Sequence, residues 1–423
     1  MRVCVVGLGK IGLPLAVQIA SKGHAVTGVD VDAEVVALVG EGQPPFPGEV
    51  DLGARLGAVV ESRLLKATTD TRGAVGDADA VVIVVPLVVD VSATPDFGAL
   101  DAATAAVGAG LRAGTLVSYE TTVPVGTTRG RLAPALARAS GLQLGRTLFV
   151  TYSPERVSSG RVFADLRRYP KLVGAIDPPS AARAVDFYRA VLDLDSGNPG
   201  VWDLGSAEAA ELTKLAETTY RDVNIGLANE FAMYADRIGV DIHAVIAAAN
   251  SQPFSHIHSP GIAVGGHCIP VYPHLYLAGD PAARIPAAAR LVNARMPAYA
   301  VARLAERLGG LAGRRVAVLG AAYRGGVKEV AFSGVFPVVD ALASAGASPA
   351  VHDPLYSDEE LRALGLPPYH LGEPADAAVV QTDHAEYRTI GPEHLPGVKA
   401  LYDGRAITDP HRWEGTPRFV LGG

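Results

Sequence analysis

Cysteine is scarce in this sequence. The 423 residues include only Cys4 and Cys268, which lie far apart along the chain. In a cytosolic chain, two distant cysteines give no disulfide framework. They also lack the clustered spacing of zinc ligands, and the eleven histidines are scattered, with His256 and His258 the nearest to a pair. The sequence therefore predicts no metal site.

Long hydrophobic runs are missing too, although hydrophobic residues make up 49% of the chain. A membrane-spanning helix needs about 20 predominantly apolar residues. The longest candidate, from Ala80 to Val89, is shorter and is interrupted by Pro86. The N-terminus begins directly with a strand pattern, so no signal peptide is expected. These features predict a cytoplasmic protein with no membrane partner.

Positive charge is in deficit. The chain has 37 Lys and Arg residues against 44 Asp and Glu residues, and its net charge is -7. A nucleic-acid partner normally requires a basic face, so none is expected. An anionic small ligand stays compatible with this composition, because helix N-termini and a few cationic side chains supply local positive charge.

The first part of the chain alternates short apolar runs with helical patterns. Arg2 to Val6 reads as a strand, and the helix after it is expected to run to Lys22 and to end at Gly23. Further strands are expected at residues 24–29, 80–85, 115–119 and 147–152. Their unbroken apolar character is typical of parallel strands buried on both faces, which predicts a doubly wound domain.

The middle of the chain has a long helical pattern. It begins at Ser206, a good N-cap, and stops at Gly239. At about 1.5 Å per residue, such a helix is roughly 50 Å long. Leu227, Phe231 and Tyr234 form a row at i, i+4 and i+7, which we expect to pack against a second subunit. The sequence thus predicts a homodimer.

A second strand-and-glycine unit begins at Arg314 and reaches Gly320, with further strands expected at 350–352 and 377–380. The predicted fold class is therefore α/β, with two Rossmann-like doubly wound parallel-sheet domains joined by a long central helix. The expected domain boundaries are 1–200, 201–305 and 306–423.

The turn after the first strand carries a dinucleotide fingerprint. Its first glycine permits the tight turn, the second admits the pyrophosphate, and the third lets helix and strand pack closely. A carboxylate after the next strand accepts hydrogen bonds from a ribose diol and repels a 2′-phosphate, so NAD is expected rather than NADP. The alternatives are a turn without ligand and an aspartate that only caps a helix. The candidate cofactor residues are Gly7, Gly9, Lys10, Ile11, Gly12 and Asp30.

Cys268 lies in the glycine-rich segment from Pro260 to Pro270, which reads PGIAVGGHCIP. Glycines there would let the backbone crowd a ligand and present the sulfur. A thiolate can attack an aldehyde to give a thiohemiacetal and, after hydride loss, a thioester. The ordinary alternative for a lone cysteine is a small buried hydrophobe, which we expect for Cys4.

Further motifs extend along the chain. They are ETTVPVGTTR at 120–129, YSPERV at 152–157, PKLVG at 170–174, AELTKLAE at 210–217, YRDVN at 220–224, GAAYR at 320–324 and QTDH at 381–384. In this order, and over nearly the whole chain, they resemble the nucleotide-sugar 6-dehydrogenase family of UDP-glucose, UDP-N-acetylhexosamine and GDP-mannose dehydrogenases. The GGHC form around Cys268 resembles the N-acetylhexosamine branch more than the UDP-glucose branch.

This resemblance implies NAD-dependent oxidation of a nucleotide sugar, foremost a UDP-sugar, at C6 toward a uronic acid. Cys268 would carry the thiohemiacetal and thioester, Lys214 would hold the sugar oxygens and the oxyanion, and Thr122 and Glu155 would position water and exchange protons. The resemblance also places Pro86, Glu120 and Thr122 at the cofactor. It places Glu155, Arg156, Lys214, Asn224, Gly265, Tyr323 and Arg324 at the substrate. The three domains would then bind NAD, mediate dimerisation and bind the nucleotide sugar, in that order.

Each inferred role has a structural alternative. In these alternatives, Lys214 is a solvated helix lysine, Glu155 is a salt-bridge partner of Arg156, and Thr122 is a strand-end hydroxyl without a ligand. These alternatives differ in burial and in partner, so a structure separates them.

The sequence departs from the family pattern at four positions. Tyr272 stands where the family has an Asp four residues after the cysteine, and Thr218 stands where it has an Asn four residues after the helix lysine. Ala331 replaces an Arg, and Leu87 replaces a Thr in the cofactor loop. The reference pKa of Tyr is about 10 against about 3.9 for Asp, so Tyr272 cannot replace the carboxylate. Because a positioned base contributes typically about 10²–10⁴-fold, we expect slow hydrolysis of the thioester.

The leading hypothesis is an oxidoreductase of polysaccharide or natural-product biosynthesis. A second hypothesis is a diverged enzyme that performs a partial oxidation or a redox-neutral, NAD-assisted change such as epimerisation. A third is a non-catalytic nucleotide-binding subunit. The retention of Cys268, Lys214 and Glu155 together argues against the third.

Overall fold

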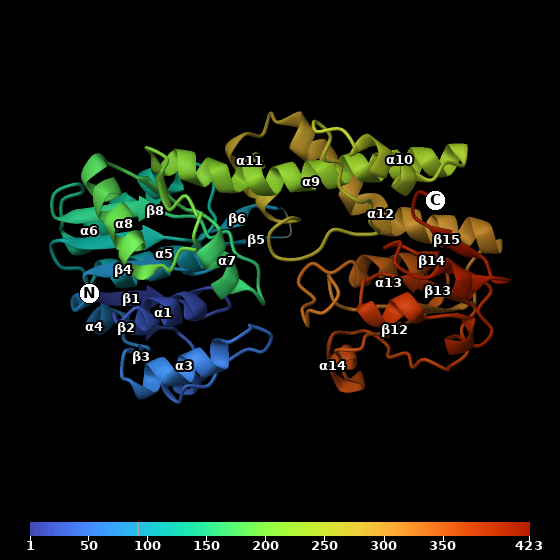
Figure 1. Ribbon diagram of the computed structural model, residues 1–423, viewed down its shortest axis with the longest axis horizontal. Coiled ribbons are helices and arrows are strands. Elements are labelled where there is room, and N and C mark those ends of the chain that lie inside the picture. Colours follow the sequence, from blue (N-terminus) through green and yellow to red (C-terminus); the bar gives the residue numbers. More distant parts are fainter. Residues whose placement is uncertain (91–92) are drawn as a thin grey trace. The chain divides into compact units, whose positions relative to one another are not determined.

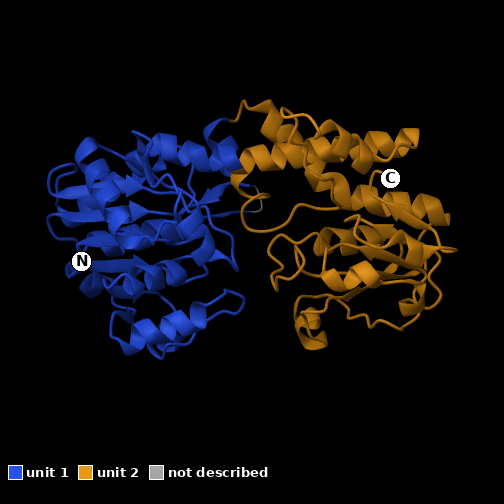
Figure 2. Ribbon diagram, in the orientation of Figure 1, with its two compact units in different colours: residues 1–217, 274–280 blue, residues 218–273, 281–423 orange. Residues whose placement is uncertain are grey.

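The computed structural model describes residues 1–90 and 93–423 (Figure 1). The chain divides into two compact units (Figure 2). Unit 1 contains residues 1–217 and 274–280, and unit 2 contains residues 218–273 and 281–423. Across the described residues, no helix has both the length and the apolar character needed to cross a membrane.

Unit 1 is an α/β unit built around one large sheet. Its strands are β1 (Arg2–Val6), β2 (Ala25–Val29), β3 (Leu65–Thr68), β4 (Ala80–Ile83), β7 (Thr115–Tyr119), β8 (Leu148–Tyr152), β9 (Lys171–Ala175) and β10 (Val201–Asp203), with β5 (Val88–Val89) and β6 (Pro95–Asp96) as a separate pair. Its helices are α1 (Gly12–Ser21), α2 (Ala33–Gly40), α3 (Leu52–Glu61), α4 (Thr71–Gly76), α5 (Gly98–Gly108), the π-helical turn η1 (Thr128–Leu132), α6 (Ala133–Ser140), α7 (Val162–Arg168) and α8 (Pro178–Val191).

The large sheet has the order β10-β9-β8-β7-β4-β1-β2-β3. From β3 to β8 this is the Rossmann order 3-2-1-4-5-6, which confirms the predicted fold class. The expected strands match to within one or two residues. Three strands of the sheet were not expected, β3, β9 and β10, and β9 runs antiparallel to β8. Strand direction depends on how the connection crosses the sheet, which the apolar pattern of a strand does not reveal.

Helices cover both faces of this sheet, as neighbouring residues of β7 demonstrate. Ser118 bonds to Tyr188 of α8 (2.7 Å), whereas Tyr119 bonds to Thr104 of α5 (3.0 Å). Successive side chains of a strand point to opposite faces, so α8 and α5 lie on opposite sides of the sheet. The carboxyl ends of its parallel strands meet at one edge, where a doubly wound sheet binds its ligand.

Unit 2 holds a second, smaller parallel sheet of order β12-β11-β13-β14-β15. Its strands are β11 (Arg315–Leu319), β12 (Ser348–His352), β13 (Ala377–Val380), β14 (Leu401–Asp403) and β15 (Arg418–Val420). Its helices are α10 (Ile242–Ala249), α12 (Arg284–Leu308), α13 (Val335–Ser344) and α14 (Asp358–Ala363), with 3-10 turns η2 (Ala385–Thr389), η3 (Pro392–His394) and η4 (Pro410–Trp413). Helix α11 (Tyr272–Gly279) begins in unit 2 and continues in unit 1.

Alternate residues of β11 feed two cores on either side of this second sheet. Val316 and Val318 pack into one core, whereas Ala317 and Leu319 pack into the other. The first core also contains apolar residues of α9 and α12, and the second contains Tyr387 and Trp413. The sheet is therefore covered on both faces, as a parallel sheet must be.

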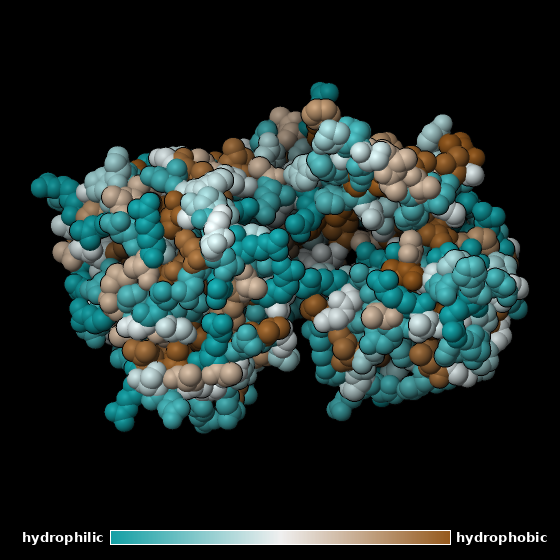
Figure 3. Space-filling view, viewed as in Figure 1, coloured by the Kyte–Doolittle hydropathy of each residue, from teal (hydrophilic) through white to brown (hydrophobic). Residues whose placement is uncertain are grey.

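Helix α9 (Ala207–Ile238) confirms the predicted long helix. The hydroxyl of Ser206 accepts the Ala209 N–H at 3.1 Å, and Gly239 adopts a left-handed φ of 70° just past the helix end. Leu227, Phe231 and Tyr234 are 46%, 37% and 55% exposed, so their row is not covered within the chain. Elsewhere on the face drawn in Figure 3, hydrophobic residues appear as scattered patches among hydrophilic ones.

Candidate functional site

The glycine turn after β1 has the geometry that each glycine of the fingerprint requires. Gly7 has φ +96°, and a Cβ there would lie 2.8 Å from the carbonyl oxygen of Val84. A Cβ on Gly12 would overlap the carbonyl of Gly7, so only glycine lets α1 start there. A Cβ on Gly9 would meet nothing within 4 Å. The turn is thus open at the position where a pyrophosphate approaches, and Lys10 and Ile11 lead from it into α1.

Asp30 ends β2 beside this turn. Its Oδ2 accepts the Leu8 N–H at 2.8 Å and its Oδ1 accepts the Asp32 N–H at 3.1 Å. The helix that follows is capped by Asp32, whose side chain accepts the Glu34 N–H. The alternative of Asp30 as an N-cap is therefore wrong. The half-buried Asp30 carboxylate is fixed at the turn, where it fits a ribose diol.

Three more expected cofactor residues follow the neighbouring strands. Pro86 is exposed after β4, and Leu87 next to it is buried. Glu120 and Thr122 are 2% and 6% exposed just after β7. Because β4 pairs in parallel with β1 and β7 pairs in parallel with β4, these residues lie along the same sheet edge as the glycine turn.

Glu155 lies in the loop after β8, with a side chain that is 12% exposed. Its Oε1 accepts the N–H groups of Arg156 (2.6 Å) and Val157 (2.9 Å), and its Oε2 lies 3.5 Å from Nζ of Lys171. Arg156 instead pairs with Glu217, Nε to Oε2 at 3.0 Å. The alternative of a Glu155–Arg156 salt bridge is therefore wrong.

Lys214 on α9 is only 7% exposed, so it is not a solvated helix lysine. Its charge helps to hold the pKa of Glu155 below the ordinary Glu value, although burial opposes this shift and Lys171 contributes more. Unit 1 thus brings Lys214, Glu155 and Glu120 into one buried electrostatic cluster. Thr218, one turn further along α9, is buried as well but belongs to unit 2.

The Cys268 loop of unit 2 is fixed at four points of its backbone. The Gly261 N–H donates to Oδ1 of Asn229 (2.9 Å), and the Ile262 N–H donates to the carbonyl of Gly404 (3.0 Å). Further along, the Gly266 N–H donates to the carbonyl of Ala331 (2.9 Å), and the Pro270 carbonyl accepts from Nη1 of Arg290 (3.0 Å). The half-buried cysteine therefore has a defined position.

Behind this loop lies a buried polar network between α9 and α12. Asn229 donates to Asn293 (2.8 Å), which donates to Asp222 (2.9 Å). Asp222 pairs with Nε of Arg290 at 2.8 Å. Sequence patterns did not single out these residues, because a polar side chain on a long helix ordinarily faces water.

Two of the loop glycines also have a packing role. A Cβ on Gly265 would lie 2.6 Å from Cβ of Tyr323 and 2.9 Å from the carbonyl oxygen of Phe332. Gly266, with φ +91°, faces the ring of the same tyrosine. The glycines thus seat the loop on Tyr323, and Arg324 follows in the same segment. The sequence did not predict this packing role.

Cys268 stands at the start of α11. Its carbonyl accepts the N–H groups of Val271 (3.2 Å) and Tyr272 (2.8 Å), which closes the first turn. Tyr272 is the first residue of the helix. The phenol that replaces the family's carboxylate therefore lies one turn from the cysteine.

Asn224 has its amide committed within unit 2. Its Nδ2 donates to the Tyr220 hydroxyl (3.0 Å) and to the His256 carbonyl (2.7 Å), and its Oδ1 accepts the His258 N–H (2.9 Å). It anchors the segment after α10.

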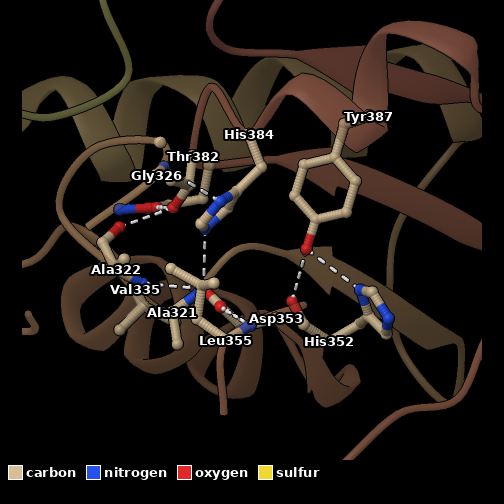
Figure 4. Close-up of polar contacts among 12 residues, drawn as sticks. Ala321, Ala322, Gly326, Val335, His352, Asp353, Leu355, Thr382, His384 and Tyr387 are labelled. Carbon is tan, nitrogen blue, oxygen red and sulfur yellow. Dashed lines mark hydrogen bonds and ion pairs between the residues drawn. The ribbon is translucent and has the colours of Figure 1, made fainter. Parts of the chain in front are cut away.

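The glycine turn of unit 2 is closed by Asp353 at the end of β12 (Figure 4). Oδ2 of Asp353 accepts the N–H groups of Ala321 (2.7 Å) and Ala322 (3.0 Å) and lies 3.0 Å from Nε2 of His384. Oδ1 accepts the Leu355 N–H at 2.9 Å. Burial alone would raise the pKa of Asp353, but these hydrogen bonds outweigh it and lower that pKa.

Both cysteines are free thiols, and burial raises the pKa of Cys4 to about 12. Cys4 in β1 is fully buried, as expected for a structural cysteine. Within residues 1–90 and 93–423, no group of three His, Cys, Asp or Glu side chains is arranged to hold a metal ion.

Family models and curated relatives match the chain along its length. Models described as the NAD binding, central and UDP binding domains of the UDP-glucose/GDP-mannose dehydrogenase family match residues 1–192, 208–295 and 317–410. A UDP-N-acetyl-D-mannosamine dehydrogenase of Pyrococcus horikoshii is 35% identical over 419 residues, covering 96% of each chain. One of Yersinia pestis is 35% identical over 310 residues, covering 71% of each.

Solved structures also resemble the chain over most of its length. A UDP-D-ManNAc dehydrogenase structure from Pyrococcus horikoshii has a TM-score of 0.89 at 32% identity, covering 100% of this chain and 99% of that one. A UDP-glucose dehydrogenase structure from Pyrobaculum islandicum has a TM-score of 0.85 at 31% identity, covering 96% and 94%.

Proposed function

The chain belongs to the UDP-glucose/GDP-mannose dehydrogenase family and is an NAD-dependent nucleotide-sugar dehydrogenase, and from this premise we propose that it oxidises C6 of a UDP-linked N-acetylhexosamine to a uronic acid. The observation that carries the proposal is Cys268, held in a loop with four fixed backbone groups. The UDP-N-acetyl-D-mannosamine dehydrogenases among the relatives and the GGHC form of the loop favour the N-acetylhexosamine.

NAD binds to unit 1 in this proposal. The open position at Gly9 admits the pyrophosphate, and the Asp30 carboxylate accepts the ribose diol. Pro86, Glu120 and Thr122 complete the cofactor-binding edge of the sheet. NAD supplies the hydride acceptor for both oxidation steps.

The chain's own groups would perform the remaining chemistry. Glu155, assisted by Lys214, accepts the proton as the C6 alcohol loses hydride and becomes an aldehyde. The Cys268 sulfur then adds to the aldehyde carbon, and the thiohemiacetal loses a second hydride to become a thioester. Water held by Thr122 and Glu155 hydrolyses the thioester, which releases the acid and restores the thiol. Each sugar thus reduces two NAD.

We propose substrate-binding residues in each of the two units. In unit 1, Lys214, Glu155 and Arg156 would hold the sugar oxygens. In unit 2, Asn224, Gly265, Tyr323 and Arg324 would form the nucleotide-sugar side, and Thr218 supplies a hydroxyl where the family has an amide. We further propose domains at 1–200 for NAD, 201–305 for dimerisation and 306–423 for the nucleotide sugar.

The homodimer is proposed from the uncovered face of α9. Leu227, Phe231, Tyr234 and Ile238 are spaced for one helix face and are each more than a third exposed. A second copy of the chain would bury this row. A monomer at micromolar concentration in analytical ultracentrifugation would contradict it. A cytoplasmic location is proposed because two unpaired thiols suit a reducing compartment.

The test counts NADH per sugar with UDP-N-acetylmannosamine and UDP-N-acetylglucosamine as substrates. Two NADH and a uronic acid are expected. One NADH would indicate a stop at the aldehyde, and an altered sugar without NADH would indicate redox-neutral chemistry. Either result would overturn the proposal.

Two variants locate the chemistry in unit 2. Cys268→Ser should abolish acid formation and preserve NAD binding, whereas Cys4→Ala, which removes the other thiol, should retain acid formation. Tyr272→Asp should accelerate hydrolysis by up to about 10²-fold, because it restores a carboxylate one turn from the cysteine. Acid formation in Cys268→Ser at the rate of the unaltered protein would exclude the thioester.

A further inference from the structure

A buried lysine lies between two of the carboxylates at the sheet edge of unit 1. Lys171 is the first residue of β9, and its side chain is 6% exposed. Its Nζ lies 2.8 Å from Oε2 of Glu120 and 3.5 Å from Oε2 of Glu155. The two carboxyl groups also influence each other directly. One ammonium group is therefore shared by two acidic groups in a largely buried site.

The surroundings tie Glu120 more firmly to the protein than to solvent. Its Oε1 accepts the Tyr188 hydroxyl at 2.6 Å, and Tyr188 in turn contacts Ser118. Nζ of Lys171 also lies 4.8 Å from the centre of the Tyr188 ring. Glu120 therefore has a neutral donor on one oxygen and a cation on the other.

Glu155 is held differently. Two backbone N–H groups fix one of its oxygens, and Lys171 faces the other. The other charged groups near it are Lys214 on α9 and the Arg156–Glu217 ion pair. Backbone N–H groups can only donate, and hydrogen bonds donated to a carboxylate are stronger than those donated to the neutral acid, so this arrangement favours the ionised form of Glu155.

We propose that Lys171 is a positioning residue, which keeps Glu155 a carboxylate, and that the burial of Glu120 beside it makes Glu120 the site where the pair holds its proton. The inference rests on the proposed function, in which Glu155 accepts a proton from the substrate. That proton is transferred to the neighbouring carboxyl group and comes to lie on an oxygen of Glu120. Lys171 remains an ammonium ion throughout, and the proton leaves to solvent when Glu120 ionises again.

The electrostatics of the cluster agree with this division. Burial, and then the charge of Glu155, raise the pKa of Glu120 to about 7 even though Lys171 opposes the shift. Burial acts on Glu155 in the same direction, but Lys171 and the Arg156 N–H outweigh it and lower its pKa. Two neighbouring carboxyl groups do not both ionise easily, so Glu120 and Glu155 should lose their protons in two separate steps.

The experiment titrates the isolated protein and follows its buried carboxyl groups by infrared spectroscopy in heavy water, without substrate. The unaltered protein should contain one buried carboxylic acid that ionises near neutrality. Glu120→Gln should lack this transition. Lys171→Met should move it upward by about 1 to 3 pH units, because a nearby opposite charge lowers a carboxyl pKa by that amount. Lys171→Arg should restore it.

A matched control is Lys66→Met, which removes an exposed lysine from β3 of the same sheet and should titrate like the unaltered protein. If Lys171→Met does not fold, the neutral double variant Lys171→Met with Glu120→Gln replaces it. Both the double variant and Glu120→Gln leave Glu155 as the remaining acid of the pair, and Glu155 should ionise at higher pH in the double variant than in Glu120→Gln.

The pH profile of NADH formation adds a catalytic readout. Lys171→Met should move the acidic limb of kcat to higher pH, and Glu120→Gln should move it to lower pH. A lower kcat with an unmoved limb in both variants would mean a merely structural lysine. A transition near neutrality that survives Glu120→Gln would overturn the inference. The infrared titration decides this even if no sugar is oxidised, so failure of the proposed function is seen separately.

Discussion

The two units begin with the same local design and use it in opposite ways. In each, a strand enters a glycine turn, Gly7 or Gly320, with φ +96° or +110°. In each, an aspartate just after the second strand accepts the N–H of the residue that follows the turn glycine. Asp30 accepts only one N–H from its turn, and its half-buried carboxylate lies at an open turn. Asp353 accepts two and also contacts His384, and it is 4% exposed.

The helices that follow the two turns also differ, because they begin at different distances along the chain from the turn. Helix α1 begins at Gly12, directly behind its turn, so its N-terminal N–H groups face the pyrophosphate position. In unit 2, the loop 320–334 separates the turn from α13. Ala322 occupies the position that corresponds to Gly9 and is fully buried. We therefore expect a dinucleotide site to need an open turn and a helix start in addition to the strand and the aspartate.

The largest expected effect comes from Asp353→Asn. The amide cannot accept all four hydrogen bonds, and breaking a buried pair typically costs about 3–5 kcal/mol. Unit 2 should unfold at lower urea concentration, whereas NAD binding to unit 1 should persist. Trp413 in unit 2 reports this unfolding by fluorescence when Trp202 in unit 1 is replaced by Phe.

The control for this variant is Asp340→Asn, an exposed aspartate of α13, which should change stability by less than about 0.5 kcal/mol. Equal stability of Asp353→Asn and the control would show that the closed turn of unit 2 does not depend on its carboxylate.

The next largest effect concerns NAD binding to unit 1. Asp30→Ala removes the acceptor for the ribose diol, and a hydrogen bond to a charged group contributes about 1.5–3 kcal/mol, so the Kd for NAD should rise about 10- to 100-fold. The preference for NAD over NADP should decrease as well, and the stability of unit 2 should not change. Calorimetric titration measures both cofactors, with the exposed Asp77→Ala as control. Unchanged NAD affinity in Asp30→Ala would exclude this cofactor site.

A smaller effect is expected when the turn of unit 1 is made more like that of unit 2. Gly9→Ala places a methyl group in open space, so the fold should tolerate it. The methyl group should obstruct the pyrophosphate at a cost of about 1–3 kcal/mol, which weakens NAD binding. Gly12→Ala is the contrasting variant, because its methyl group overlaps the Gly7 carbonyl and should lower the melting temperature. Equal NAD affinity in Gly9→Ala would show that the pyrophosphate lies elsewhere.

The smallest effect is a difference in acid stability. The pKa of Asp353 is lowered in the folded protein, so its contribution is complete above the ordinary Asp pKa of about 3.9 and is lost as the pH falls through the lowered value. Unit 2 should therefore lose stability below about pH 4. Asp353→Asn should lack this contribution, and urea titrations of the Trp413 signal at pH 3 to 6 should reveal the difference. If the stability of unit 2 changed with pH in the same way in Asp353→Asn and in the unaltered protein, this contribution of Asp353 would be contradicted.

Local patterns predicted much of the fold. The glycine turn, the length of α9 and most strands depend on nearest neighbours, so spacing and caps define them. The antiparallel β9 was missed, because its direction depends on the path of the connection. Asp353 was missed for a related reason: its partners His384, Ala321 and Leu355 come together only in the folded sheet.

The site was predicted less completely than the fold. Cys268, Lys214 and Glu155 lie in recognisable motifs, and the structure gives them defined surroundings. Lys171 was quoted only as part of a motif, since a lysine at a strand start ordinarily reaches water. Its burial is set by α8 and by the carboxylates beyond it, which no local pattern contains.

The central claim is that only one of the two similar turns binds the dinucleotide. The most direct measurement is a calorimetric titration of the whole chain with NAD, followed by UDP. One NAD per chain is expected, with UDP binding in addition to it and without displacement. A second NAD per chain, or displacement of NAD by UDP, would contradict the claim.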